Sequence, residues 1–165
     1  MSKVKTYKPI PVSSATTAWG LLQAVKRAIL EEPRRVNMNL YVSCINPSSS
    51  APRGVPACGT VGCFAGWVAV LGRQHLASRY EDTRDRQVID NFTDADAQKL
   101  LGPGINYNIA GDEGRYVFNS GEGDACSETT PGTKAHARAV VARINKFMRV
   151  NEVALKARKL SQTVA

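Results

Sequence analysis

The chain has 165 residues, of which 43% are hydrophobic, and this suits one domain, residues 1–165, with a core that needs no metal or disulfide staples. The 22 Lys and Arg residues outnumber the 14 Asp and Glu residues, which gives a net charge of +8 and favours an anionic partner. No apolar run approaches the length of a membrane span, which argues against an integral membrane protein.

The positive charge is concentrated at the two ends of the sequence. Residues 1–35 hold seven bases and two acids, residues 134–165 hold eight bases and one acid, and the middle holds seven bases and eleven acids. This distribution suits a nucleic acid, a nucleotide or an acidic protein as partner. A solvated basic surface that only keeps the protein soluble is the competing interpretation.

The basic start of the chain is not followed by the apolar segment of a secretory signal, so we expect a cytoplasmic location. In that compartment the four cysteines are expected to be reduced thiols.

Helical spacing of apolar residues predicts the first helix at about 18–30. Several hydroxyl side chains between Ser13 and Thr17 can cap its start, and Pro33 forces its end. Residues Val36–Val42 are compatible with a short strand or one helical turn, and the Pro/Ser-rich residues 46–56 predict an exposed loop.

The segment at 60–71 predicts a helix that is apolar all round and therefore buried. Thr60 is its expected N-cap, and Gly72 is its expected left-handed stop. Small residues line one face of this helix and would let a neighbouring helix approach closely: Gly62, Ala65, Gly66 and Ala69.

A short helix is predicted after Thr93, with acids in its first turn and Gly102 as its stop. Residues 104–124 predict a turn of helix or a small hairpin. The last helix is expected to start at Thr130-Pro131. Its apolar stripe faces away from a basic outer face made of Arg138, Asn145, Lys146 and Arg149, with Arg143 at the border.

The predicted fold is mainly α, a compact single domain of helices around the buried central helix 60–71. Minor β content, in the form of a hairpin, is expected at 36–42 or 104–118. Residues 1–14 and 151–165 are expected to form flexible basic ends.

Cysteines, histidines and carboxylates offer further chemistry. Cys58 and Cys63 could form a tetrahedral zinc site with Cys44 and Cys126, but their spacing argues against it. We favour a buried small side chain for Cys63 because it falls inside the predicted helix. Cys58 at a helix start would be a nucleophile if a histidine lay near it, although His75 is expected on the surface and His136 in an exposed first turn.

Two other features are explained without chemistry. The glycines around Gly62 lack the lysine of a phosphate-binding loop, so close packing explains them better. The pair Asp94 and Asp96 could hold magnesium, but the electrostatics of a helix start account for it.

The stretch Cys58-Gly59-Thr60-Val61-Gly62-Cys63-Phe64-Ala65-Gly66-Trp67 resembles the core motif of a family of uncharacterised bacterial and phage proteins, Cys-Gly-Thr-x-x-Cys-x-Ala-Gly-Trp/His. Shorter matches follow in the same order: Asn37–Tyr41, Ala97–Gly102, Tyr116–Phe118 and Thr130-Pro131. The resemblance implies a shared fold and transfers no catalytic residue.

The sequence therefore favours a small basic non-enzymatic binding protein, of the accessory type that phages and bacteria use. Its ligand would be a nucleotide, a cyclic nucleotide or a nucleic-acid backbone, and no cofactor or metal is expected. The expected ligand-binding residues lie at the motif and on the last helix: Cys58, Gly59, Thr60, Arg138, Arg143, Lys146 and Arg149. The alternatives are a module that inhibits or adapts an acidic host protein, an enzyme that uses Cys58 or a carboxylate pair, and, for assembly, a homo-oligomer.

Overall fold

The computed structural model describes residues 13–38, 42–44, 60–76, 94–108, 117–118, 126 and 128–160. These residues form a mainly helical structure. Its elements are α1 (Ala18–Glu31), the 3-10 turn η1 (Pro33–Arg35), β1 (Val42–Cys44), β2 (Thr60–Gly62), α2 (Phe64–Leu71), the 3-10 turn η2 (Arg73–His75), α3 (Asp94–Leu101), α4 (Lys134–Val150) and α5 (Glu152–Ala157).

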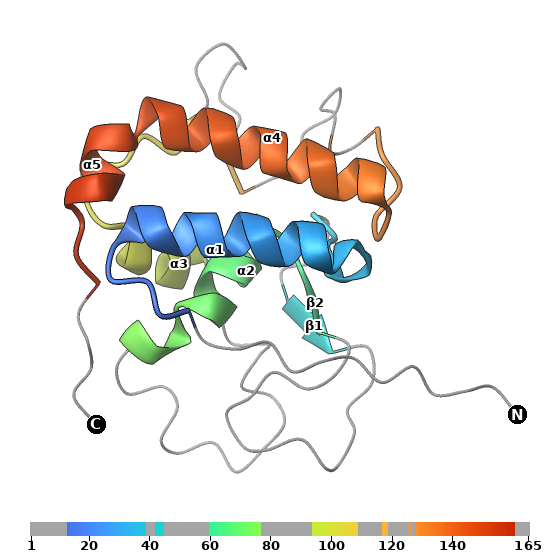
Figure 1. Cartoon of the computed structure of the whole chain (residues 1–165), viewed down its shortest axis with the longest axis horizontal. Coiled ribbons are helices and arrows are strands. Elements are labelled where there is room, and N and C mark those ends of the chain that lie inside the picture. The colour runs from blue at the N-terminus through green and yellow to red at the C-terminus, as the bar shows by residue number, and fades with distance from the viewer. Residues whose placement is uncertain are drawn as a thin grey trace, which may run out of the picture.

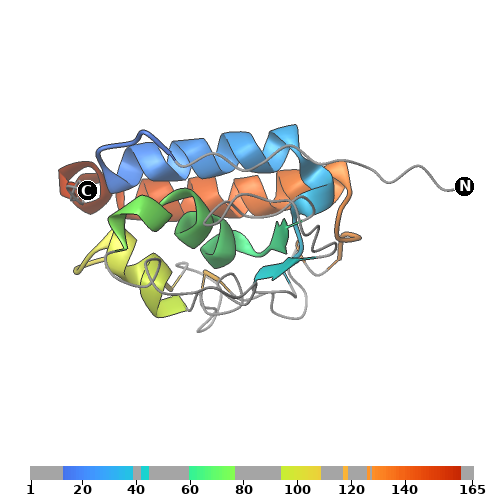
Figure 2. The ribbon, with the colours of Figure 1, turned by 90° about the horizontal axis from the view of Figure 1, so that it is seen from below.

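Helices α1 and α4 run antiparallel, side by side, and form one layer of the molecule (Figure 1). Helices α2 and α3 and the strand pair form a second layer, which covers the inner side of α1 (Figure 2). The core lies between these layers because each long helix turns an apolar stripe inward. In α4 this stripe includes Ala137, Val140, Ile144 and Phe147, all 1% exposed or less.

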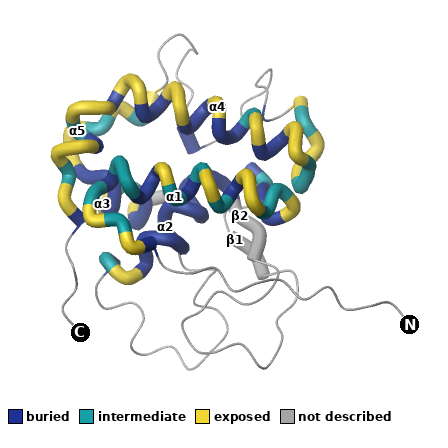
Figure 3. Tube along the Cα trace, viewed as in Figure 1, coloured by how far each residue is buried: buried dark blue, intermediate teal, exposed yellow. Residues whose placement is uncertain are grey.

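Helix α2 is the centre of the core, since all eight of its residues are buried (Figure 3). The Phe64 ring meets the ring of Phe118 edge-on, with 5.2 Å between centroids, and that of Phe147 with 5.9 Å. Such edge-to-face pairs add to the free energy gained from burial. The prediction of a buried central helix is therefore confirmed.

The start of α2 differs from the prediction. Thr60 is not its N-cap but the first residue of β2, which pairs antiparallel with β1 in the register Val42↔Gly62 and Cys44↔Thr60. Because this pairing holds the backbone extended, the helix begins only at Phe64, with Cys63 as N-cap. In the described part of the chain the strands lie at 42–44 and 60–62 and join two distant segments. The first begins at Val42, the last residue of the predicted range 36–42, and residues 109–116 of the range 104–118 lie outside the described residues.

The end of α2 is also different. Gly72 has φ −91°, so it is not the left-handed stop that we predicted. A Cβ atom at this position would lie 2.8 Å from Leu100 Cδ1 and 3.0 Å from Leu21 Cδ2. A glycine is needed here because side chains from α1 and α3 leave no room for a methyl group.

Two helix boundaries lie where the sequence predicted them. Thr17 is the N-cap of α1, and its Oγ1 accepts a hydrogen bond from the Gly20 N–H at 3.1 Å, while Pro33 follows the end of the helix. Helix α3 ends at Gly102, which has φ +94° and donates its N–H to the Gln98 carbonyl. Both signals are local, and each sits within one turn of the boundary.

The start of α4 lies later than predicted. The N-cap is Thr133, whose Oγ1 accepts a hydrogen bond from the His136 N–H at 3.2 Å, so Thr130-Pro131 does not open the helix. Gly132 has φ +78°, a left-handed conformation that a right-handed helix cannot contain, and its N–H donates to the Val36 carbonyl.

A flexible end was expected at 151–165, but residues 151–160 are packed and hydrogen-bonded as part of the fold. Residues 161–165 lie outside the described residues. Helix α5 buries Leu155, and the segment behind it pairs with the start of α1. The Ala18 N–H donates to the Arg158 carbonyl at 3.0 Å, and the Leu160 N–H donates to the Thr16 carbonyl at 2.9 Å.

Other expectations fall largely on residues that the structure does not describe. The predicted loop 46–56 lies outside the described residues, as do residues 1–12 and most of 104–124. Within the last range, the Val117 N–H donates to the Tyr107 carbonyl at 2.9 Å, which ties residues 117–118 to the segment after α3. Ser13, expected in a flexible end, is buried and donates its N–H to the Leu71 carbonyl.

Gly72→Ala tests the packing at the end of α2. The new methyl group would overlap Leu100 and Leu21, so we expect a loss of about 1–3 kcal/mol in the free energy of unfolding. Urea unfolding followed by circular dichroism measures this loss, and unchanged stability would contradict the described packing. Ala142→Ser, on the exposed face of α4, is the control and should change stability by about 0.5 kcal/mol or less.

Candidate functional site

The sequence motif and the last helix, which we predicted as parts of one ligand site, differ in what they present to solvent. Cys58 and Gly59 lie outside the described residues, and Thr60 belongs to β2. The helix start that was expected to hold an anion is covered, since Cys63 is 3% exposed and Phe64 is fully buried. We therefore do not retain the start of α2 as a ligand site.

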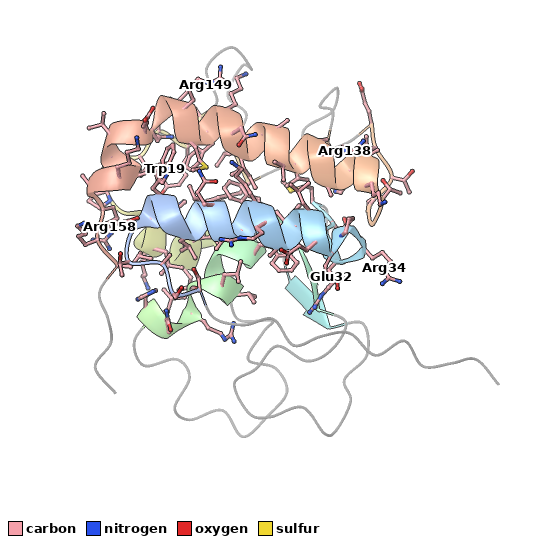
Figure 4. The ribbon with its side chains drawn as sticks, in the orientation of Figure 1. Trp19, Glu32, Arg34, Arg138, Arg149 and Arg158 are labelled. Atoms are coloured by element: carbon pink, nitrogen blue, oxygen red, sulfur yellow. The ribbon has the colours of Figure 1, made fainter. Side chains whose placement is uncertain are left out.

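The outer face of α4, by contrast, carries a row of exposed cations, which we call the α4 basic row: Lys134, Arg138, Lys146 and Arg149. Arg138 and Arg149 point away from α1 (Figure 4). Eleven residues separate these two arginines, which is three helical turns and about 16 Å along the axis. At 100° per residue the four cations of the row spread over about 120° of the helix circumference, so they form a broad positive face along α4.

Arg143 does not belong to this row. It was predicted at the border of the outer face, and the structure places it among the buried residues at 8% exposure. A turn of 100° per residue moves it well away from Arg138, toward the packed side of α4. Arg143 is thus buried, whereas the four residues of the row are exposed to solvent.

Lys134 is the member of the row that the sequence analysis did not name. It is the first residue of α4, and the first turn of the helix has no acid. A cation in the first turn interacts unfavourably with the helix dipole, where Asp or Glu would stabilise the helix by about 0.3–1 kcal/mol. Lys134 therefore contributes charge to the outer face without stabilising the helix.

The acids of the described residues leave three members of the row, Lys134, Arg138 and Arg149, without an ion pair. The sequence of α4 contains no Asp or Glu. Glu152, just beyond it, pairs with Lys156 of α5. These three cations are exposed, and no acid of the described residues lies within ion-pair distance of them. An exposed cation of this kind keeps its charge available to an outside partner.

The thiols whose surroundings the structure describes are buried, whereas Cys58, the candidate nucleophile, lies outside the described residues, so the enzymatic alternatives stay predictions. Burial raises the pKa of the Cys126 thiol to about 11, whereas a nucleophilic cysteine needs a lowered pKa. Cys63 is buried as well. Asp96 is 2% exposed, and the described residues contain no group of three or more potential metal ligands.

His136 is buried at 1% exposure, so the expectation of an exposed first-turn residue is wrong. Its Nε2 accepts a hydrogen bond from the Met38 N–H at 3.4 Å, and its Nδ1 lies 3.0 Å from Thr129 Oγ1. An acceptor role at Nε2 requires the neutral ring with its proton on Nδ1. His136 therefore joins three separate segments as a structural residue. His75, expected on the surface, is half-buried in η2.

Comparison of the chain with family models, with curated proteins and with solved structures gives no match. The resemblance to the uncharacterised bacterial and phage family thus stays a prediction. In the described part of the chain, no helix combines the length and the apolar character that a membrane span requires.

His136 predicts a pH dependence of stability. Burial lowers its pKa below the ordinary value, so the folded state binds fewer protons at this site than the unfolded state. Its contribution to stability is complete above the unfolded-state pKa of about 6.5 and is lost as the pH falls toward the folded-state value.

We expect the free energy of unfolding to decrease as the pH falls through the unfolded-state pKa of about 6.5, and His136→Gln to weaken this dependence. At pH 7 the variant should lose about 1–3 kcal/mol, since buried hydrogen bonds are disturbed. Denaturant unfolding at several pH values measures both effects. An identical pH slope in His136→Gln and the original protein would contradict the neutral, buried histidine.

Proposed function

We propose that this chain is a non-enzymatic binding protein whose α4 basic row holds the phosphate backbone of a nucleic-acid duplex. The observation that supports the proposal most directly is the row itself: four exposed cations on one helix that contains no acid. Lys and Arg that neutralise phosphates supply most of the affinity in binding that does not depend on base sequence.

The geometry of α4 supports a duplex over a single strand. Lys134 and Arg149 are fifteen residues apart, about 22 Å along a straight helix, which suits the regular phosphate array of a duplex. Proteins that bind single strands combine cations with aromatic side chains on which bases stack. The α4 basic row contains no aromatic residue, and half-buried Trp19 of α1 is covered by Lys156, whose Nζ is 4.9 Å from the ring centroid.

The packing of α4 gives the row a rigid support. Phe147 and Ile144 anchor the inner face of the helix in the core, and Thr133 caps its start. Because the cations are on a helix and not on a loop, their spacing is fixed before the partner arrives. A preorganised surface of this kind loses little conformational entropy on binding. Contacts to phosphates alone carry no sequence information, so the proposed binding is not specific for a base sequence.

Removing two charges from the row tests the proposal. The double variant Arg138→Gln/Arg149→Gln should bind a short DNA duplex more weakly, and the slope of log K against log salt should fall in magnitude by about 2. Fluorescence anisotropy at several salt concentrations gives both quantities. The matched control is Lys99→Gln/Lys156→Gln, which loses the same net charge on α3 and α5.

The control should bind the duplex with nearly the original affinity. Equal weakening of both double variants would mean that only net charge matters and would contradict the α4 basic row as the interface. If the original protein does not bind a duplex but binds an acidic peptide, the proposal is wrong and the alternative, a module that binds an acidic host protein, is favoured.

A further inference from the structure

A cavity of about 590 Å³ lies at the end of α3, on a part of the molecule separate from the α4 basic row. Its walls come from the last turns of α3, from the turn after Gly102 and from two more distant residues, Tyr107 and Arg158. Figure 4 shows Arg158 near the start of α1, away from the face that carries Arg138 and Arg149. The cavity is shallow and wide open to solvent, so a ligand bound there would keep one side exposed.

Arg158 is held in this wall by contacts on both sides. Its guanidinium donates a hydrogen bond from Nη2 to the Lys99 carbonyl at 2.9 Å, and its own carbonyl accepts from the Ala18 N–H. A Cβ atom on Gly102, which has φ +94°, would come within 2.8 Å of Arg158 Cδ. The glycine therefore serves two purposes, since it ends α3 and gives the arginine room to cross the end of the helix.

The electrostatics of the cavity favour an anion. The C-terminal end of a helix carries partial negative charge, which alone would repel an anion, but Arg158 places a full positive charge over this end of α3. Lys99 adds a second cation, with 66% of its side chain exposed and with Asp96 at 3.8 Å as a loose, buried partner. The described residues that line the cavity include no carboxylate.

The remaining walls suit a flat ring. Tyr107 packs its ring near those of Phe118 and Phe147, with centroids 5.6 Å and 5.9 Å away, so the ring is fixed in place. Ile105 and Pro103 extend this apolar side of the cavity. One side of the site is thus apolar and aromatic, and the other is cationic.

We propose that this cavity binds a small anion that carries a ring, with a nucleoside monophosphate as the fitting chemical class. The phosphate lies between Lys99 and Arg158, and the ring lies against Tyr107 and Pro103. Charge-assisted hydrogen bonds from arginine to phosphate are stronger than those between neutral groups, and the fixed guanidinium directs them. This site does not depend on the duplex interface.

Isothermal titration calorimetry with adenosine monophosphate tests the site in the full chain. We expect one bound molecule, and about tenfold weaker binding in Lys99→Gln because one charged partner of the phosphate is lost. Ala95→Glu is a second variant that preserves the fold, since residue 95 is exposed and an acid in the first turn of α3 is favourable. The added charge should also weaken binding.

Arg149→Gln is the control, because it removes a cation outside the cavity and should leave the affinity for adenosine monophosphate unchanged. Absence of binding by the original protein, or equal affinity in Lys99→Gln and Ala95→Glu, would overturn the site. Orthophosphate that binds as tightly as the nucleotide would overturn the role of the ring. If adenosine monophosphate does not bind but a duplex does, only the cavity site is wrong. If a duplex does not bind but adenosine monophosphate does, only the α4 basic row is wrong as an interface.

Discussion

The complete burial of α2 is the constraint on which the rest of the structure depends. A helix with no exposed face must be covered on every side, and here α1, α3, the strand pair and the aromatic residues around Phe64 supply the cover. Gly72, directly after α2, lets α1 and α3 approach at the same point, since Leu21 and Leu100 occupy the space that a Cβ atom would need. The outer faces of α1 and α4 are then left to meet solvent and partners.

Helix α4 has an inner face that packs in the core and an outer face that carries exposed charges. The inner stripe fixes the helix in the core, while the outer face carries charges that do nothing for packing. The sequence predicted Arg138, Lys146 and Arg149 on this face because helical periodicity depends only on spacing. Lys134, the first residue of α4, was not named. Arg143 was expected at the border of this face, but it is buried, and its burial depends on which segments pack beside the helix.

Local signals predicted the fold well where they acted alone. Thr17 and Pro33 set the ends of α1 from within one turn, as the sequence indicated. The starts of α2 and α4 depend on distant partners, β1 in one case and Val36 bonded to Gly132 in the other, and no nearby residue reports such pairing. The cavity could not be predicted either, because Arg158 reaches it from a segment 59 residues beyond Lys99.

The central claim is that the outer face of α4 meets a phosphate backbone while the packed layers stay unchanged. A titration of isotopically labelled protein with a short DNA duplex, followed by two-dimensional amide NMR, tests this claim residue by residue. The account predicts shifts that concentrate along the exposed side of α4, at Lys134, Arg138, Lys146 and Arg149, with little change at α2 and at the end of α3. Shifts confined to other surfaces, or none at all, would contradict it.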